Sequence, residues 1–345
     1  MMASRAQLIV NNWNTVRYEL MNARVCDLGL AIEGSPVEPL VDRVCRELSA
    51  KELAFRPVFY LTDSWGCPNE VPAVGIPFYL ADRRLARIEE EQTGEVEDSR
   101  TILMFLRHEI GHAINYAYRL WKRPGWTGTF GHFSRPYRDS FRPDPSSRAF
   151  VRHLVHSSYG RHYAQKHPDE DFAETFAVWL TPRSSWRRRY RSWPAMKKLR
   201  FVAQLMGDMQ DRTPRTGVER LLNPVDQMTM LLAEHYGQRA ERYRAMAQGY
   251  VDDKLREVFP VRRGRGLLPA AALIRRHRTD LATSIGHWSA LDPAEVETIL
   301  EKLEDRAKAL GLRVSRGRIA AKLMDMTALA TSLAMDFAYT GRFTG

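Results

Sequence analysis

The first third of the chain has two helical patterns of apolar residues, followed by two strand-like ones. Apolar side chains recur at helical spacing over residues 6–30 and again over residues 37–53, which predicts two amphipathic helices. Short β-branched and aromatic runs at residues 56–61 and 76–80 predict two strands, separated by the turn-rich stretch 63–75. We expect the two helices to cover the sheet to which these strands belong.

The middle of the chain carries the strongest helical pattern. From residue 99 to about residue 120, apolar residues recur every three or four positions with no proline among them. Residues 121–148 are rich in glycine, proline and aromatic side chains, which suits a long structured loop. A second helix is predicted over residues 169–180, because Pro168 suits a helix start and Pro182 marks a stop.

The last part of the chain, beyond about residue 211, has a helical pattern throughout, with no strand signal and no internal repeat. Its predicted helices are residues 224–250, 291–310 and 315–339. The sequence therefore predicts an α+β domain over residues 1–210, followed by a helical region of unknown role over residues 211–345.

Composition and charge narrow the class of protein. Of the 345 residues, 44% are apolar and 27% are charged, as in a folded soluble protein. The N-terminal apolar run, Leu8 to Val10, is far shorter than a membrane span of roughly 20 residues. The three cysteines form no C-x-x-C pair, which favours a reducing, cytoplasmic location over a disulfide framework or a zinc ribbon. A net charge of +11 favours acidic partners.

A metal-binding motif lies inside the strongest predicted helix. His108-Glu109-Ile110-Gly111-His112 is an H-E-x-x-H sequence, and its i, i+4 spacing places both imidazoles on one helix face, where they can share a zinc ion. The alternative is a pair of solvated surface histidines. The apolar pattern of this helix argues against that alternative, because polar groups on a buried face need partners or a metal.

A catalytic zinc site needs a third protein ligand. The metzincin continuation is excluded, because Asn115 and Tyr118 occupy the positions where it requires glycine and histidine. Glu170 and Glu174 lie one turn apart on the second predicted helix, so that one can bind zinc while the other orients a ligand histidine. Two alternatives stay open here. The neighbouring acids, Asp169 and Asp171, compete for the ligand role, and the whole segment would also suit a solvated acidic first turn.

These motifs resemble those of the gluzincin metallopeptidases, including the peptidase domain of anthrax lethal factor. The sequence segment Asp171-Phe172-Ala173-Glu174-Thr175-Phe176-Ala177 is still more similar to the corresponding segment of uncharacterised bacterial proteins named as zinc-binding metallopeptidases. The likeness covers roughly residues 99–182. It implies a zincin-like fold, Zn²⁺ as cofactor, Glu170 as the third ligand and Glu174 as the carboxylate that orients a ligand histidine. It also matches Tyr163 to a tyrosine that stabilises the oxyanion, although Tyr159, His162 and His167 crowd the same stretch.

The reaction expected from this site is hydrolysis of a peptide bond. A zinc ion lowers the pKa of its water towards about 7, and Glu109 would take the proton as general base and pass it to the leaving amine. Tyr163 or a neighbouring histidine would donate a hydrogen bond to the oxyanion. Three further histidines, His132, His153 and His156, are left out of the predicted site, because a lone histidine is more often structural than catalytic.

Three basic segments support a rival interpretation. Residues 186–191 combine arginines with Trp186 and Tyr190, and further arginines cluster at residues 262–265 and 275–278. Stacking and phosphate contact in a nucleic-acid-binding protein with a vestigial zinc site would have this pattern. No nucleic-acid-binding motif accompanies the segments, so a solvated or substrate-facing surface is preferred. A peptide or acidic protein substrate is the expected partner, and hydrolysis of a small peptide conjugate is the other alternative. Substrate preference, exo- or endopeptidase action and oligomeric state are not indicated.

Overall fold

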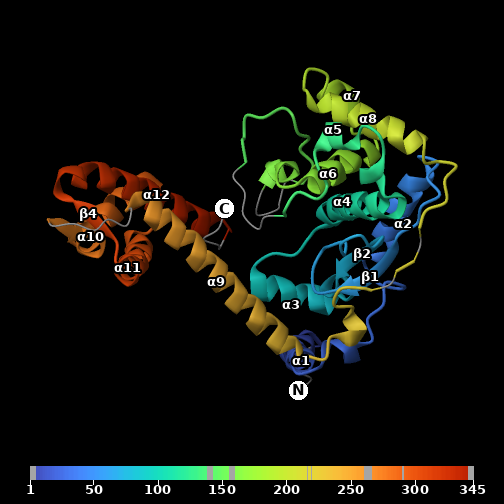
Figure 1. Cartoon of the computed structure of the whole chain (residues 1–345). Coiled ribbons are helices and arrows are strands. Elements are labelled where there is room, and N and C mark those ends of the chain that lie inside the picture. Colours follow the sequence, from blue (N-terminus) through green and yellow to red (C-terminus); the bar gives the residue numbers. More distant parts are fainter. Residues whose placement is uncertain are drawn as a thin grey trace. The chain divides into compact units, whose positions relative to one another are not determined.

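The computed structural model describes residues 5–137, 143–154, 160–215, 217–218, 220–259, 266–289 and 291–340. The chain forms two compact units, Met1–His235 and Tyr236–Gly345 (Figure 1). The N-terminal unit combines helices with a small sheet, as expected for an α+β domain. No described helix has both the length and the apolar character that a membrane span requires.

The sheet of the N-terminal unit consists of two parallel strands, β1 (Val58–Thr62) and β2 (Ala73–Pro77). The first strand matches its prediction closely, whereas the second lies several residues earlier than predicted. The ladder ends at Pro77, because proline has no N–H to donate. The aromatic run that follows is buried in the 3₁₀ turn Phe78–Ala81, so it packs in the core without continuing the strand.

The helices of this unit begin and end close to most of the predicted limits. They are α1 (Arg5–Met21), α2 (Glu38–Ser49), α3 (Arg83–Thr93), α4 (Ser99–Tyr118), α5 (Trp126–Phe130), α6 (Pro168–Leu180), α7 (Trp186–Arg189) and α8 (Ala195–Gly207). The helix predicted to reach residue 30 ends at Met21, since the following backbone pairs elsewhere. The N–H of Val25 donates to Met230 O at 3.1 Å, and that of Cys26 to Met228 O at 3.0 Å.

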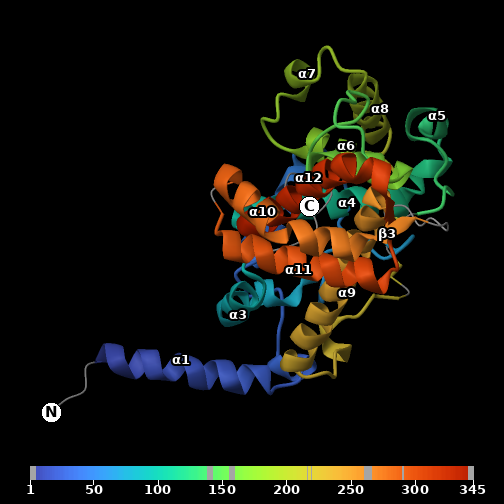
Figure 2. The ribbon, with the colours of Figure 1, turned by 90° about the vertical axis from the view of Figure 1, so that its left-hand side faces the viewer.

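Four helices of this unit were not predicted from the sequence: α3, α5, α7 and α8. α3 is rich in charged residues and buries only two apolar side chains, Leu85 and Ile88, on its core-facing side; Asp82 caps its start and Gly94 adopts the left-handed conformation at its end. Its surface supports α1, where Trp13 Nε1 donates to Glu91 at 3.0 Å (Figure 2). Within the predicted long loop, Trp126 and Phe130 of α5 are buried, which anchors that segment to the core.

The centre of the N-terminal unit is α4, which contacts α2, β2 and α6. Because it is covered on several sides, 15 of its 20 residues are buried, including the polar ones of the H-E-x-x-H motif. Asp98 caps its start by accepting the N–H of Thr101 at 2.7 Å. In α6, every residue from Pro168 to Leu180 is buried. The acids of its first turn are therefore interior groups, and the alternative of a solvated acidic turn is wrong.

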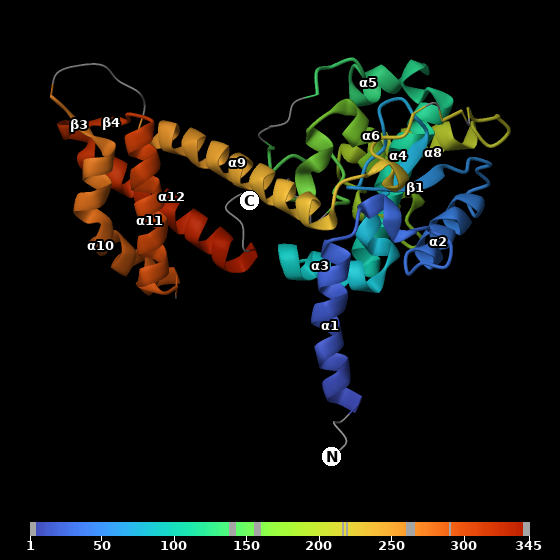
Figure 3. The same cartoon turned by 90° about the horizontal axis from the view of Figure 1, so that it is seen from below.

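The C-terminal unit is built of long helices and a short pair of strands. Its elements are α9 (Leu232–Val258), β3 (Leu267–Pro269), α10 (Ala270–Ser289), α11 (Pro293–Ala309), β4 (Arg313–Ser315) and α12 (Ile319–Thr340). The expectation that no strand follows residue 211 is wrong, because β3 and β4 pair antiparallel at the start of α10 (Figure 3). Three-residue strands are too short to give an alternating pattern.

The compact units divide after His235, whereas the sequence placed a boundary near residue 210. The intervening segment is hydrogen-bonded to the N-terminal unit. Arg215 N–H donates to Ala117 O at 3.0 Å, and Leu232 N–H donates to Ala23 O at 3.0 Å. The helix predicted over residues 224–250 therefore begins later than expected. A short 3₁₀ turn follows Pro224, and α9 begins at Leu232.

Candidate metal centre

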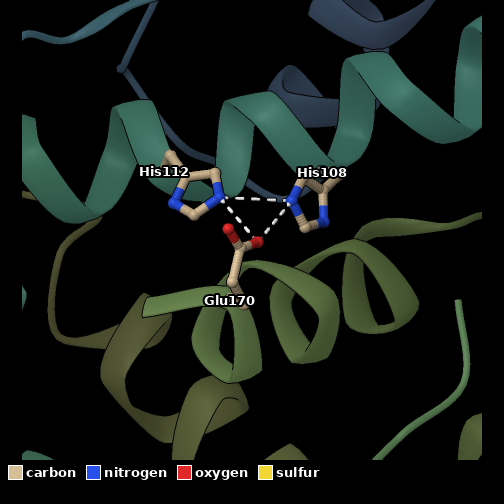
Figure 4. Close-up of side chains that lie close together, drawn as sticks. All are labelled: His108, His112 and Glu170. Carbon is tan, nitrogen blue, oxygen red and sulfur yellow. Dashed lines mark hydrogen bonds and ion pairs between the residues drawn. The ribbon is translucent and has the colours of Figure 1, made fainter. Parts of the chain in front are cut away.

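Three side chains from two facing helices meet at one point in the N-terminal unit. His108 and His112 lie one turn apart on α4, and Glu170 reaches them from the first turn of α6 (Figure 4). His108 Nε2 lies 3.0 Å and His112 Nε2 lies 3.3 Å from Glu170 Oε2. The two Nε2 atoms are 3.2 Å apart. All three side chains are buried.

The spacing of these atoms fits a tetrahedral zinc ion. Nitrogen and oxygen ligands lie about 2.0–2.1 Å from zinc, so two ligands of a tetrahedron are about 3.3–3.4 Å apart. The three observed separations, 3.0, 3.2 and 3.3 Å, are close to this value. The donor set, two imidazole nitrogens and one carboxylate oxygen, is also one that zinc accepts. The residues present therefore fit the ion.

A carboxylate holds the second nitrogen of each imidazole. His108 Nδ1 donates to Glu174 Oε1 at 3.0 Å, and His112 Nδ1 donates to Asp169 Oδ2 at 2.8 Å. Because a carboxylate only accepts, these contacts place a proton on Nδ1 of each ring, so Nε2 is the nitrogen of each ring that would bind a metal at the common point. Asp169, which the sequence left as a rival ligand, lies behind His112.

Each of these carboxylates is held in turn by further donors. Asp169 accepts from Asn115 Nδ2 and from the Tyr116 hydroxyl, both at 2.6 Å. Glu174 is fully buried and accepts the backbone N–H groups of His153 at 3.0 Å and Leu154 at 3.1 Å. Sequence reasoning missed these supports. Asn115 follows His112 by three residues on the same helix, which was the one signal available for it.

The remaining acid of the segment, Asp171, points to a different partner. Its Oδ2 is 2.5 Å from Lys198 Nζ on α8. Burial raises the pKa of the Asp171 carboxyl to about 7, although the ammonium of Lys198 opposes this shift. Asp171 therefore fastens α6 to α8 and is not one of the three converging groups.

The positive charge of the protonated imidazoles and the negative charge of the neighbouring carboxylates stabilise each other at the centre. Burial alone would lower the pKa of His108, but hydrogen bonds to Glu170 and Glu174 outweigh it and raise the pKa to about 9. The pKa of His112 is also raised well above its usual value, because Asp169 and Glu170 overcome the effect of burial. The two imidazoles hold the pKa of the Glu170 carboxyl well below its usual range despite its burial. A cation at this point would take over the role of these protons.

Glu109 lies beside the three groups, in the wall of a cavity of about 780 Å³. It is 7% exposed and makes no hydrogen bond to the described residues. Burial raises the pKa of its carboxyl, which brings a carboxylate closer to the range of a general base at neutral pH. The same cavity is lined by Tyr116, Tyr163 and the stacked rings of Trp65 and Phe105.

Two tyrosines lie over the carboxylate of Glu170. Tyr137 donates to Glu170 Oε1, and its hydroxyl is 3.3 Å from that of Tyr163. The ring centroid of Tyr163 is 5.8 Å from that of His108, so Tyr163 lies beside the candidate metal ligands. Burial raises the pKa of both hydroxyls, and both therefore carry protons to donate. Tyr137 belongs to the glycine- and proline-rich loop, and nothing in the sequence marked it.

The other histidines considered earlier have structural roles or lie elsewhere. His167 caps α6, since its Nδ1 accepts the N–H of Asp169 at 3.1 Å while its Nε2 donates to Arg135 O at 2.8 Å. The side chain of His153 is bound to Met104 O at 3.0 Å. His132 is exposed. His156 and Tyr159, which neighbour these residues in the sequence, lie outside the described part of the chain.

The basic segments are poorly arranged for stacking on bases. Trp186 is 6% exposed and Tyr190 is 1% exposed, so the aromatic rings of residues 186–191 belong to the core. In the C-terminal unit, Arg275 lies 2.7 Å from Glu304, and Arg278 lies 3.0 Å from Glu301. These cations are paired within the chain. Arginines 262, 263 and 265 are outside the described residues.

Comparison with known proteins points to the same chemistry. Residues 78–245 match the family model described as "putative zinc-binding metallo-peptidase". The matched segment contains α4 and α6 and hence all three converging groups. No curated protein and no solved structure gives a match to the chain. The family match and the buried donor group together support a zinc-binding metallopeptidase.

Proposed function

We propose that the chain is a zinc-dependent peptidase of the gluzincin type, with His108, His112 and Glu170 as metal ligands on a zincin-like domain. The observation that carries this proposal is the triangle of donor atoms with edges of 3.0, 3.2 and 3.3 Å, which matches the edges of a tetrahedral zinc site. Three protein ligands leave the fourth position for water or substrate, as catalytic zinc sites require.

Glu109 would act as the general base. A bound zinc ion supplies polarisation of the scissile carbonyl and lowers the pKa of water towards about 7. Glu109 lies in the cavity wall next to both histidines, and it has no described partner to compete for its carboxylate. It can therefore accept a proton from the attacking water and deliver it to the leaving amine.

The two tyrosines would have different roles, Tyr137 at the metal ligand Glu170 and Tyr163 at the substrate carbonyl. Tyr137 occupies Glu170 Oε1 and leaves Oε2 for the metal. Tyr163 lies beside it at the cavity, where a protonated hydroxyl can donate to the carbonyl oxygen as that oxygen gains charge. A cavity of about 780 Å³ admits several residues of an extended peptide, which favours a peptide or protein over a small conjugate as substrate.

The test is cleavage of a mixed peptide library by the purified zinc-loaded protein, followed by mass spectrometry. The proposal expects new termini with the wild-type protein and a loss of roughly 10²- to 10⁴-fold in rate for Glu109→Gln. Glu90→Gln, at an exposed position on α3, is the matched control and should cleave normally. A Glu109→Gln protein as active as the wild type would exclude this mechanism.

A further inference from the structure

A second large cavity lies on a different face of α4. It measures about 820 Å³, and Arg100, Leu103, Met104 and Arg107 line it at helical spacing. Residues 105, 108, 109, 112 and 116 of the same helix line the metal cavity instead. No residue lines both cavities. The second cavity is thus a separate feature of the N-terminal unit.

Arginine dominates the wall of this cavity. The five arginines are Arg43, Arg100, Arg107, Arg152 and Arg189, and no aspartate or glutamate is among the lining residues. Behind the wall, Glu47 takes both hydrogen bonds of Arg107 at 2.7 Å and lies 3.4 Å from Arg43. One carboxylate thus serves two guanidinium groups, and the cavity keeps a strongly positive field.

Three of the arginines keep donors for another partner. Arg100 and Arg189 are exposed and form no ion pair with a described residue, and the guanidinium of Arg189 lies 5.4 Å from the ring centroid of Tyr190. Arg152 donates one hydrogen bond, from Nη2 to Pro145 O at 2.9 Å, while its Nε is buried without a partner in the described structure. A guanidinium presents five N–H donors in a planar fork that suits phosphate and carboxylate oxygens.

Uncharged donors add to this arrangement. Ser99 and Ser184 line the cavity beside the arginines. Ser99 is also the first residue of the 20-residue helix α4, whose positive end favours anions. The carboxylate of Asp98 caps this helix by accepting the N–H of Thr101 at 2.7 Å. Serine hydroxyls and helix N-termini both bind phosphate oxygens well.

We propose that this arginine-lined cavity binds a small multivalent anion that carries phosphate groups, such as a pyrophosphate or nucleotide-like ligand. Several guanidinium groups line a cavity that is large enough for an organic molecule. Both its volume and its positive charge are greater than a single monovalent anion would require. A nucleic-acid strand is the less suitable occupant. The one tryptophan among the described lining residues, Trp193, already lies against Arg152, whose guanidinium is 5.0 Å from the ring centroid. The other ring in the wall, the imidazole of His153, is bound to Met104 O at 3.0 Å.

The experiment is calorimetric titration of pyrophosphate, and separately of ATP, into the full-length protein at low ionic strength. Metal is first removed with phenanthroline and the chelator is dialysed away, so that pyrophosphate and ATP cannot bind through a zinc ion. Saturable binding that weakens with added salt is expected. Arg100→Gln/Arg189→Gln should weaken binding at least about tenfold, because hydrogen bonds to charged groups are worth roughly that much each.

The matched control is Arg46→Gln/Arg200→Gln, which removes the same charge from exposed helical positions outside the cavity. It should bind like the wild type. Ser99→Glu provides an independent variant, because an acid suits the first turn of a helix yet repels an anion in this cavity. It should also weaken binding at least about tenfold.

Three results would overturn the proposal. The first is absence of saturable binding. The second is equal loss of binding in the cavity variant and the control, which would mean a diffuse charge effect. The third is tighter binding of a single-stranded oligonucleotide than of pyrophosphate, abolished by the same cavity substitutions, which would assign the arginines to nucleic acid. None of these results depends on whether the metal centre hydrolyses peptides.

Discussion

Gly111 of α4 lies directly against the backbone of Ala173 in α6. A Cβ atom built on Gly111 would be 2.8 Å from Ala173 Cα and 3.0 Å from Ala173 O, which is closer than side chains tolerate. Gly111, the fourth residue of the H-E-x-x-H sequence, is thus a point where the backbones of the two ligand-bearing helices approach closely. Because Gly111 adjoins His112, this contact sets how far Glu170 must reach to meet the two imidazoles.

The first prediction follows from this contact. Gly111→Ala gains roughly 1 kcal/mol of intrinsic helix propensity, but the added methyl group must push backbone away from backbone. We expect a net fall in thermal stability and weaker zinc binding. Gly237→Ala, within α9 and with open space around it, is the control and should keep or raise stability. A Gly111→Ala protein with unchanged unfolding temperature and zinc affinity would show that the approach is not tight.

The second prediction separates the carboxylates around the metal. Glu170→Gln should weaken zinc binding most, because it removes the ligand charge. Asp169→Asn and Glu174→Gln should each cost about 10- to 100-fold in affinity, as is typical for groups that orient ligand histidines. Competition with a chromophoric chelator measures all three. The assignment of Glu170 would be rejected if Asp169→Asn lost the metal while Glu170→Gln retained it.

The third prediction distinguishes the two tyrosines. Tyr163→Phe should lower kcat and kcat/KM together, by about 10²- to 10³-fold, with normal zinc affinity, because an oxyanion contact forms only in the transition state. Tyr137→Phe should weaken zinc binding instead, since its hydroxyl holds Oε1 of Glu170. Steady-state kinetics and zinc titration of both variants make the comparison. A raised KM with normal kcat in Tyr163→Phe would indicate a substrate contact in the ground state.

The fourth prediction concerns pH. The pKa of His108 is raised to about 9, and that of His112 is also raised, so zinc must displace protons at neutral pH. Zinc affinity should rise by about tenfold per pH unit for each displaced proton until pH reaches about 9. The metal-free protein should behave oppositely. Its stabilisation by protonated His108 is complete below the unfolded pKa of about 6.5 and is lost as pH rises through 9.

Zinc titrations and thermal unfolding between pH 6 and 9 measure these two trends. Buffers with different ionisation enthalpies report the number of protons released. A zinc affinity that stays flat over this range would mean that the imidazoles are already unprotonated, and the ion pairs with Glu170, Asp169 and Glu174 would then be weaker than their distances suggest.

The sequence identified the central helices because their patterns are local. His108 and His112 share a face by helical periodicity alone, and the start of α6 follows from Pro168. What it could not supply are contacts between segments far apart in the chain. The sequence left Asp169 open as a rival ligand, and only the packing of α6 against α4 places it behind His112.

Other misses have different physical causes. Tyr137 comes from an irregular loop, where no periodicity indicates which side chain turns inward. The backbone N–H groups that hold Glu174 belong to His153 and Leu154, and any residue type could supply them. The arginines of the second cavity are dispersed between residues 43 and 189, so no cluster is visible along the chain.

The most direct test of the account is the zinc content of the purified protein, measured by inductively coupled plasma mass spectrometry. We expect about one zinc per chain in the wild type and in the exposed-histidine control His132→Ala, and almost none in His108→Ala or His112→Ala. Circular dichroism would establish that the variants are folded. Stoichiometric zinc in folded His108→Ala and His112→Ala proteins would contradict the proposed metal centre.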